Sequence, residues 1–360
     1  MEIRVIESLR EYKKFFKRVY ANDRNFIDNK SNLLPIVCGK NSAFYKKSIQ
    51  QMVGVFDNGM AICQCILIIH REYKEAVFMS FFEALPQKHE GVKTLIDYAV
   101  EFGRKNGCTK VIAGIEGHPN NSIGFSVSNS APPSFGECYS PGYYADYFKD
   151  FNKINMVSLI GDFAEVKNAV DQDYNKFIDV FSEFDIEYGD FSLKGFRKTM
   201  KIYTDLSNEI FIDHRDVYYR SYEEDYELFS SMRPILKNEN LIFVKKEGRY
   251  VGLSFWYPDF NELTDIHKSF GVKEFIKYRF LGRIPRKMKM VEIGVLPEYQ
   301  NKGLMLLLFK NAIELAAKKY PNSQKVISSW ILAENKKSVL LSRRYTKDLY
   351  KEYVYYERSI

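Results

Sequence analysis

The sequence predicts a duplicated α/β or α+β architecture, in which each half is a mixed sheet flanked by helices. Three observations predict it. The 360 residues, 46% apolar and 16% aromatic, suit two hydrophobic cores better than one. One succession of hairpin, strand, crossover helix and strand occurs twice, at an offset of a little over two hundred residues. In both copies a proline separates the strand from the helix.

The first copy begins with a hairpin signal, Asp57-Asn58-Gly59. A strand-like run at 76–83 leads to Pro86 and a helix that Gly107 ends, and a β-branched run at 109–115 follows. The helix has one apolar face, formed by Val92, Leu95, Ile96, Ala99 and Phe102.

The second copy repeats this order. Its hairpin turns at 247–249, its strand is 290–295, its break is Pro297, and its last strand is 325–331. The apolar helix face contains Met305, Leu308, Phe309, Ala312, Leu315 and Ala316.

Two segments set the predicted domain boundary. A strand-like run at 156–160 closes the first half, and 166–187 has the pattern of a helical connector. The predicted domains are therefore 1–164 and 165–360. The basic and aromatic stretch 263–287 is either a lid over a pocket or a packed helical insertion, and the sequence leaves both open.

Composition narrows the functional classes. The net charge of +7 arises from scattered Lys and Arg, which favours attraction of a polyanionic coenzyme, and no nucleic-acid motif accompanies it. Five sparse cysteines argue against a disulfide framework and for a reducing compartment. The first residues lack a signal-peptide pattern, and the apolar runs are too short to span a bilayer. We expect a cytoplasmic protein with no nucleic-acid or membrane partner and no metal site.

The segment from Val295 to Met305 joins a strand to a helix through a short loop. The first N–H groups of a helix have no internal partners and carry the positive end of its dipole, so they can bind a pyrophosphate. Gly303 lets the backbone approach such a ligand closely.

This segment resembles the acetyl-coenzyme A motif of the GNAT (N-acetyltransferase) superfamily, in which Gln or Arg, two residues, Gly, one residue, and Gly or Ala follow one another. Gln300, Gly303 and Met305 occupy these places. Downstream, 335–341 is similar to the family's Asn-x-x-Ala-x-x-Leu helix, and 350–358 to its last strand.

The whole chain resembles bacterial tandem-GNAT proteins of unassigned function. The local matches are Phe81-Phe82-Glu83, Ser140-Pro141-Gly142-Tyr143-Tyr144, Pro258-Asp259-Phe260-Asn261-Glu262, Ser329-Trp330-Ile331-Leu332-Ala333-Glu334-Asn335 and Tyr355-Tyr356-Glu357. The resemblance implies two GNAT-like domains and an acyl-coenzyme A co-substrate.

The resemblance also implies roles for individual residues. Acetyl-coenzyme A, or another acyl-coenzyme A, would bind along the strand 290–295 and the loop after it, with the thioester carbonyl at the Val295 amide. The implied contacts are Ile293, Gly294, Val295, Gln300, Asn301, Lys302, Gly303, Leu304, Met305 and Asn335. Asn335 is also a natural cap for the final helix.

Glu292 is the first candidate for the base that accepts the proton of the amine, although an ordinary paired carboxylate is the more frequent role of such a residue. Asp259, Asn261 and Glu262 are candidates for binding the amine, or are turn residues. Trp330 lines the acceptor pocket or fills the core, and core filling is the safer interpretation.

Two departures from the GNAT pattern weaken the enzymatic prediction. Met305 replaces the usual Gly or Ala, and Ser342 replaces the tyrosine that commonly protonates the leaving thiolate, with Tyr345 one turn away. In the first half, Gln87 and Gly91 are one residue too far apart, so that half is expected to be a degenerate copy.

The leading functional prediction is transfer of an acetyl or other acyl group from coenzyme A to a small amine or amino-acid-like acceptor. The alternatives are a catalytically silent tandem GNAT protein that binds acyl-coenzyme A or another ligand, and transfer of an aminoacyl or longer acyl group.

Overall fold

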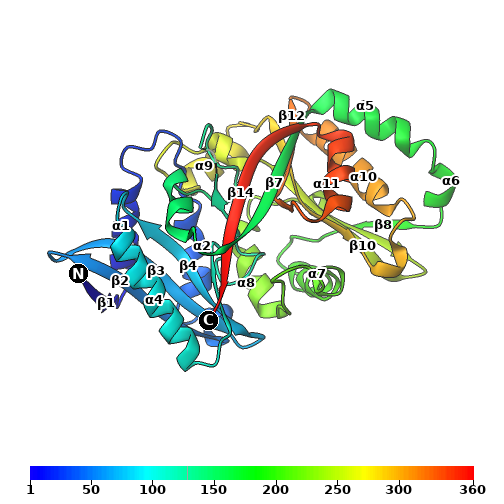
Figure 1. Cartoon of the computed structure of the whole chain (residues 1–360). Coiled ribbons are helices and arrows are strands. Elements are labelled where there is room, and N and C mark those ends of the chain that lie inside the picture. Colours follow the sequence, from blue (N-terminus) through cyan, green and yellow to red (C-terminus); the bar gives the residue numbers. More distant parts are fainter. Residues whose placement is uncertain (128) are drawn as a thin grey trace. The chain divides into compact units, whose positions relative to one another are not determined.

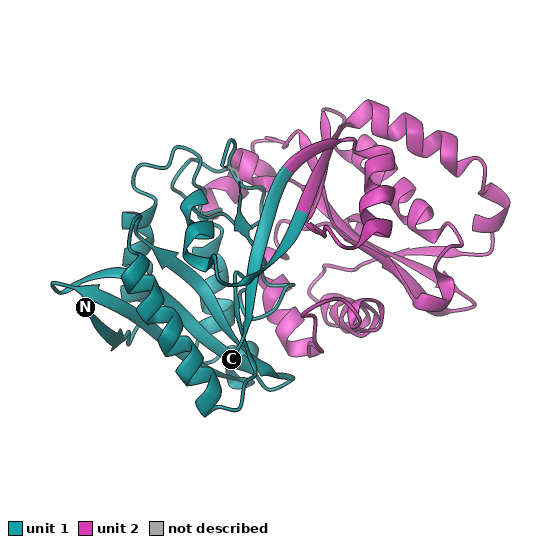
Figure 2. Ribbon diagram, viewed as in Figure 1, with its two compact units in different colours: residues 1–156, 264–270, 351–360 teal, residues 157–263, 271–350 magenta. Residues whose placement is uncertain are grey.

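The computed structural model describes residues 1–127 and 129–360, and they form two compact units. Unit 1 contains residues 1–156, 264–270 and 351–360, and unit 2 contains 157–263 and 271–350 (Figure 2). Both units combine a mixed sheet with helices, as the sequence predicted (Figure 1).

The sheet of unit 1 has the strand order β1-β2-β3-β4-β5-β14. Its neighbours are antiparallel except for β4 and β5, which the crossover helix α4 makes parallel. The elements that contribute to this unit are β1 (Glu2–Val5), α1 (Leu9–Val19), α2 (Lys30–Cys38), α3 (Ala43–Lys46), β2 (Ser48–Asp57), β3 (Met60–His70), β4 (Tyr73–Ala84), α4 (His89–Lys105), β5 (Lys110–Ala113), β6 (Phe125–Ser126), the 3₁₀ helix η1 (Gly142–Phe148), the first half of β7 (Asn152–Asp162) and most of β14 (Asp348–Ser359).

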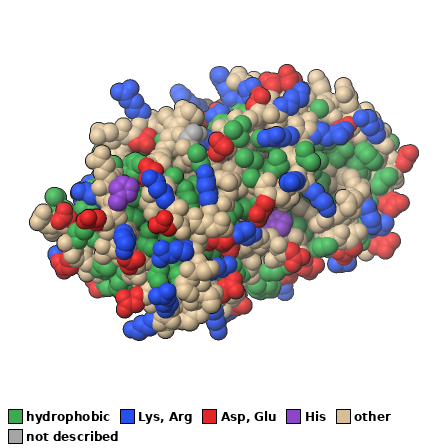
Figure 3. All heavy atoms as spheres, viewed as in Figure 1, with side chains coloured by type: hydrophobic (Ala, Val, Ile, Leu, Met, Phe, Trp, Pro, Cys, Tyr) green, Lys and Arg blue, Asp and Glu red, His purple; other side chains and the backbone are tan. Residues whose placement is uncertain are grey.

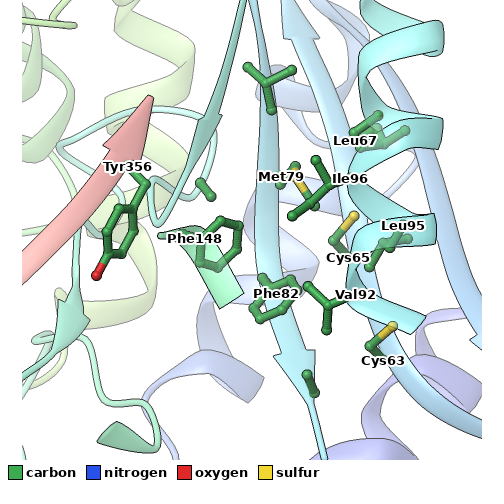
Figure 4. Packing of buried hydrophobic residues seen from close by; sticks show 14 of the residues in the cluster. Cys63, Cys65, Leu67, Met79, Phe82, Val92, Leu95, Ile96, Phe148 and Tyr356 are labelled. Carbon is green, nitrogen blue, oxygen red and sulfur yellow. The ribbon is translucent and has the colours of Figure 1, made fainter. Parts of the chain in front are cut away.

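Helix α4 covers one face of this sheet (Figure 1). Its apolar face packs on the side of β3 that carries Cys63 and Cys65. On the other face, the Gln64 side chain donates to the Tyr12 carbonyl of α1 (3.0 Å). Phe148 lies between Phe82 and Tyr356 in this core, with ring centroids 5.1 and 5.2 Å away (Figure 4).

The sheet of unit 2 has the order β7-β12-β11-β10-β9-β8, and only β11 and β12 are parallel neighbours. Its further elements are α5 (Phe163–Tyr174), α6 (Ile178–Phe181), β8 (Asp185–Tyr188), α7 (Phe196–Phe211), α8 (Tyr222–Met232), η2 (Asn238–Asn240), β9 (Leu241–Lys246), β10 (Arg249–Pro258), η3 (Phe260–Leu263), α9 (Val272–Arg279), β11 (Lys287–Val295), η4 (Pro297–Tyr299), α10 (Leu304–Lys319), β12 (Lys325–Ser328), β13 (Ile331–Leu332), which pairs with β7, and α11 (Lys336–Tyr345).

Helices α7 and α10 cover opposite faces of this sheet, and two glycines keep them close to it. A Cβ on Gly294 would lie 2.5 Å from Ile210 of α7, and a Cβ on Gly252 would lie 2.8 Å from Val295 and 3.4 Å from Leu308 of α10. Glu292, two residues before Gly294, therefore faces α7.

The two repeated units of the sequence are confirmed, including both hairpin turns. Asn58 and Gly59 have φ of 48° and 77°, and Glu247 and Gly248 have φ of 50° and 81°. These positive angles are those of a two-residue turn whose twist matches the strands.

The predicted single boundary at residue 164 does not describe the units. β7 enters unit 2 at Val157 and pairs with β12, and β14, predicted as the last strand of the second half, pairs with β5 in unit 1. Pairing partners so far apart in the chain leave no local pattern in the sequence. The predicted helical connector is also partly wrong, because Asp185–Tyr188 is strand β8, paired with β9.

All five cysteines are buried and unpaired, as predicted. None of the helices in the described part of the chain is long and apolar enough to cross a membrane. On the face seen in Figure 3, Lys and Arg side chains alternate with acidic ones, as the scattered charges of the sequence led us to expect.

The C-terminal strand should stabilise unit 1. Tyr356 is 3% exposed and packs against Phe148 of η1 and Phe125 of β6, so Tyr356→Ala should lower the free energy of unfolding by about 3 kcal/mol. Urea unfolding measures this. Leu349→Ala, at a 52% exposed position of the same strand, is the control. An equal, small effect of both variants would contradict the assignment of β14 to this core.

Candidate active site

The sheet of unit 2 opens between β11 and β12. The two strands pair only from Lys287↔Lys325 to Met290↔Ser328, and the last link is the Ser329 N–H to the Met290 carbonyl (2.7 Å). Beyond it, Ile331–Leu332 pairs with β7 instead. Within the described residues, the second half of β11 therefore has a strand neighbour on one side only.

The backbone of β11 directs N–H groups into this opening. A register shift at Phe255/Trp256 leaves one extra residue, Val291, on β11. The Leu296 N–H donates to Val251 of β10 (2.9 Å). Because successive N–H groups alternate between the two edges of a strand, those of Val295 and Ile293 point away from β10. The candidate oxyanion donor is thus oriented as the sequence-based mechanism requires.

The opening leads to the turn before α10. Gly303 has a φ of 78° and Asn301 a φ of 62°, and this turn brings the chain directly into the helix. The N–H groups of Leu306 and Leu307 both donate to the Gly303 carbonyl. Among the described residues, the N–H groups of Asn301 to Met305 have no hydrogen-bond partner.

The side chains leave this turn accessible. Gln300, Asn301 and Lys302 are exposed, Met305 is partly buried, and Leu304 packs into the core. One aromatic ring lies nearby, since a Cβ on Gly303 would be 3.3 Å from Phe181 of α6. The turn therefore has the free donors, the positive helix end and the exposure that an anion site needs.

Glu292 lies at the opening, at the centre of a polar network. Its carboxylate accepts hydrogen bonds from the Tyr203 hydroxyl (2.6 Å) and the Ser207 hydroxyl (2.7 Å). Burial raises the pKa of Glu292, and the Arg220 charge and these two hydrogen bonds oppose that rise. A carboxyl with a raised pKa beside an opening is a candidate base.

The partners of Glu292 are held in turn. Arg220 donates to Ser207 (3.0 Å) and forms a buried ion pair with Asp225 (2.9 Å). Tyr203, Ser207 and Arg220 were not among the site residues predicted from the sequence. The available signal was the four-residue spacing of two hydroxyls on the inward face of α7.

The two acid candidates of α11 are engaged elsewhere. The Tyr345 hydroxyl donates to Asp173 of α5 (3.1 Å), and burial together with that carboxylate raises the pKa of Tyr345 to about 12. Arg344 binds the same carboxylate through two hydrogen bonds. Ser342 lies 3.2 Å from the Thr346 hydroxyl. These contacts tie α11 to α5 and leave Tyr345 weakly acidic.

Asn335 caps α11, because its side chain accepts the Ser338 N–H (3.1 Å). Trp330 follows the last link between β11 and β12 and is partly buried, so the choice between the acceptor pocket and the core stays a prediction. The buried tryptophan of this unit is Trp256. Trp330 is thus in a position to line the opening.

The predicted amine-binding residues lie at the other end of β11. The Asp259 N–H donates to the Lys287 carbonyl, and Glu262 accepts the N–H groups of Arg286 and Lys287 (2.6 and 2.9 Å). Asn261 is buried beside Asp259. From Lys287 to Val295 the strand rises about 26 Å at ~3.3 Å per residue. These contacts make the three residues part of the turn before β11, about 10 Å along the strand from the parting at Met290. Their binding of an amine stays a prediction.

Unit 1 has the same parting of strands, and its own side chains fill it. β4 and β5 pair only as far as Met79↔Ala113. Ala84 precedes Leu85-Pro86 as Val295 precedes Leu296-Pro297, and the Ala84 N–H donates to the Tyr144 hydroxyl (2.8 Å). The Lys88 N–H, before α4, donates to the Tyr147 hydroxyl (3.2 Å).

A buried carboxylate completes this internal filling. The Phe81 N–H, in a bulge where φ is 50°, donates to Glu116. Glu83 is buried with Lys30 (2.5 Å) and accepts from Tyr144 (2.6 Å). Side chains of unit 1 thus occupy the Phe81, Ala84 and Lys88 N–H groups beside its opening, and the degeneracy of the first half stays a prediction.

The comparisons with known proteins concern the fold. No family model and no curated protein matches the sequence. Among solved structures, a tandem GNAT protein from the clavulanic acid biosynthesis pathway matches with a TM-score of 0.54 and 11% identity over 99% of this chain and 98% of that one. This chain has the tandem GNAT fold.

Two further structures support the tandem GNAT fold. A GCN5-related glucosamine N-acetyltransferase region of a fungal β-N-acetylglucosaminidase matches with a TM-score of 0.59 and 14% identity over 99% of this chain. This chain spans only 38% of the length of that multi-domain protein. A GCN5-related N-acetyltransferase from Sphaerobacter thermophilus matches with a TM-score of 0.54 and 10% identity, covering 99% of this chain and 95% of that one.

In residues 1–127 and 129–360, no group of three or more His, Cys, Asp or Glu side chains is placed to hold a metal ion.

The filled site of unit 1 predicts a pH dependence. Burial raises the pKa of Glu116 to about 7. Since the folded-state pKa lies above the unfolded value, the stabilisation is complete below the unfolded pKa and is lost as the pH rises towards 7. Glu116→Gln should therefore be the more stable protein at pH 8, by up to about 3 kcal/mol, and should lose part of the pH dependence.

Urea unfolding at acidic and alkaline pH measures this difference. Glu101→Gln, which replaces an exposed carboxylate of α4, should leave the pH dependence unchanged. An unchanged pH profile for Glu116→Gln would show that Glu116 is ionised without cost.

Proposed function

We propose that this protein transfers an acetyl or other acyl group from coenzyme A to a small amine. The observation that carries the proposal is the exposed turn before α10, where consecutive N–H groups without partners adjoin the opening between β11 and β12. The N-acetyltransferases with similar structures support the same class of reaction.

The chain would hold the thioester in three places. The N–H groups from Asn301 to Met305 would bind the pyrophosphate, and the pantetheine arm would pair with the open edge of β11 at Ile293 and Val295, whose N–H groups point away from β10. The Val295 N–H would donate to the thioester carbonyl oxygen, where negative charge develops as the amine attacks. These contacts fix the geometry of the reaction and so lower its entropic barrier.

Glu292 would take the proton of the amine. As the N–C bond forms, the amine nitrogen loses a proton to Glu292, directly or through a water molecule, and the C–S bond breaks to release the coenzyme A thiolate. Tyr203 and Ser207 hold both carboxylate oxygens in place. Trp330 would line the acceptor side.

A catalytically silent acyl-coenzyme A-binding protein is the second candidate. The observation that favours it is the anchoring of Tyr345 to Asp173, which leaves no tyrosine of α11 free to protonate the thiolate. Met305, which replaces the usual Gly or Ala beside the turn and is partly buried, also favours this alternative. A thiolate is a good leaving group and can take its proton from water after it leaves. Transfer without a general acid is therefore possible in chemical terms, and it stays the first proposal.

The acceptor class follows from the carboxylate and the partly exposed Trp330 at the opening, which suit a small cationic amine. Five buried thiols without disulfides fit a reducing compartment, and we propose the cytoplasm.

Release of free coenzyme A thiol across a panel of amines, including amino sugars and amino acids, tests the proposal. Turnover with at least one amine supports transfer. Binding of acetyl-coenzyme A without turnover on any amine supports the silent alternative, and absence of binding would overturn both.

Gly303→Asp should abolish binding of acetyl-coenzyme A. The new carboxylate would lie at the N-terminus of α10, where it would repel the pyrophosphate and compete for the same N–H groups. We expect a loss of at least about 2 kcal/mol, or about thirtyfold, by calorimetry.

Two variants control for backbone strain. Gly303→Ala adds a side chain at the same positive φ without the charge and should weaken binding less. Gly248→Asp adds the charge at a turn with nothing within 4 Å and should have no effect. Equal affinity of Gly303→Asp and the unaltered protein would contradict the pyrophosphate site.

Glu292→Gln should lower kcat by about 10² to 10⁴ while the affinity for acetyl-coenzyme A stays the same. Because the base acts when ionised, kcat/KM should rise with pH through the raised pKa of Glu292. Tyr203→Phe removes a hydrogen bond that stabilises the carboxylate, so this limb should shift to higher pH.

Tyr219→Phe, at a 53% exposed position of the same unit, is the matched control. If Tyr203→Phe lowers the rate equally at every pH, Tyr203 has only a structural role and Glu292 is not the titrating base.

A further inference from the structure

An apolar surface without a partner lies on and after helix α9 of unit 2. We call it the α9 surface. Val272, Phe280 and Leu281 are 76%, 74% and 66% exposed, and Ile276 and Ile284 are also exposed. Val272, Ile276 and Phe280 are four residues apart, so they share one face of the helix. Five exposed large apolar side chains within thirteen residues form a patch that water disfavours.

The opposite face of α9 fixes the helix to the unit. Tyr278 packs against Phe260 with ring centroids 5.1 Å apart, and its hydroxyl lies 2.9 Å from that of Tyr320. Glu274 is buried and accepts the Gly271 N–H (3.0 Å). The stretch 263–287 thus contains a packed helix, which is one of the two predicted alternatives, and the exposure of its outer face is not a sign of poor packing.

The end of α9 is closed. Gly282 has a φ of 60°, the Arg283 N–H donates to Lys277 (3.0 Å), and the N–H groups of Phe280 and Leu281 both donate to Ile276. The tip that presents Phe280 and Leu281 therefore has its main-chain donors satisfied, so it can enter an apolar layer without the cost of unpaired N–H groups.

Positive charge surrounds these apolar side chains. Arg279, Arg283 and Arg286 are exposed, and within the described residues they form no ion pair. Lys273 is also exposed, whereas the one acidic residue of the stretch 271–286, Glu274, is buried. The exposed charge of the α9 surface is therefore of one sign.

We propose that the α9 surface binds the interface of an anionic lipid bilayer. Phe280, Leu281 and Ile284 would enter the boundary between headgroups and acyl chains, and the guanidinium groups of Arg279, Arg283 and Arg286 would bind the lipid phosphates above them. The surface of an anionic bilayer presents phosphates and, just beneath them, acyl chains. The stretch 279–284 presents arginines next to apolar side chains, so it can contact both at once. The association is peripheral and revises our expectation from the sequence of no membrane partner.

The α9 surface is remote from the Gly303 turn within unit 2. Tyr278 contacts Tyr320, which follows the C-terminal end of α10, and the turn precedes the other end. A helix of 16 residues is about 24 Å long. The stretch is therefore not a lid over that turn, and the proposal does not rest on the acyltransferase function.

Vesicle sedimentation tests the proposal. The full chain should partition onto vesicles of phosphatidylglycerol and phosphatidylcholine and not onto vesicles of phosphatidylcholine alone, and added salt should weaken the partitioning. Arg279→Gln with Arg283→Gln should weaken it about fivefold per charge removed. Phe280→Ser with Leu281→Ser should weaken it at least about tenfold at any salt concentration.

Leu193→Ser, at an 80% exposed leucine of the same unit, is the control and should partition like the unaltered protein. All these side chains are on the surface, so circular dichroism should show unchanged folding.

Three results would overturn the proposal. One is equal partitioning onto both kinds of vesicle, or none. Another is undiminished binding of the Phe280→Ser, Leu281→Ser variant to anionic vesicles, which would show that the α9 surface binds polyanions through its charge alone. The third is a dimer that those two substitutions convert to a monomer, which would show that a second copy of the chain covers the α9 surface.

Discussion

The parting of β11 from β12 is the constraint on which the candidate site depends. The hydrogen bond from the Ser329 N–H to Met290 is the last link between the two strands. Had the parallel pairing continued, the N–H groups of Ile293 and Val295 would bond to β12, and no edge would be left for a ligand. Glu292, two residues before Gly294, faces α7, where Tyr203 and Ser207 hold it. The parting therefore leaves the candidate oxyanion donor free, and strand alternation places the candidate base on the α7 face.

The two units show what this constraint permits. Both sheets part after four parallel pairs, so the opening belongs to the fold. In unit 1, Tyr144, Tyr147 and Glu116 occupy the N–H groups that line it. Burying Glu116 there is costly, as its raised pKa shows, and the bulge holds Phe81 in the left-handed region. The opening between β4 and β5 is thus lined by buried side chains of unit 1. The opening between β11 and β12 keeps N–H groups without partners among the described residues.

The sequence predicted the parts that depend on local patterns. Hairpin turns, amphipathic helices and the glycine turn before α10 follow from backbone preferences of residues such as Asn58 and Gly303, and they were found where expected. The exchange of the closing strands β7 and β14 was not predictable, because pairing between residues more than 160 positions apart has no local signature. Asp259 and Glu262 were predicted to bind the amine because they follow a hairpin strand, and the structure places them in the turn between β10 and the start of β11. Tyr203 was missed because its role depends on which helix covers the opening.

Calorimetric titration of the full chain with acetyl-coenzyme A tests the central claim most directly, because side chains of unit 1 occupy N–H groups beside its opening, whereas the N–H groups of the unit 2 turn have no partner among the described residues. We predict one molecule bound per chain, through the turn of unit 2. Two molecules per chain would contradict the filled state of unit 1, and no binding would contradict the claim that the opening beside β11 receives a coenzyme A thioester.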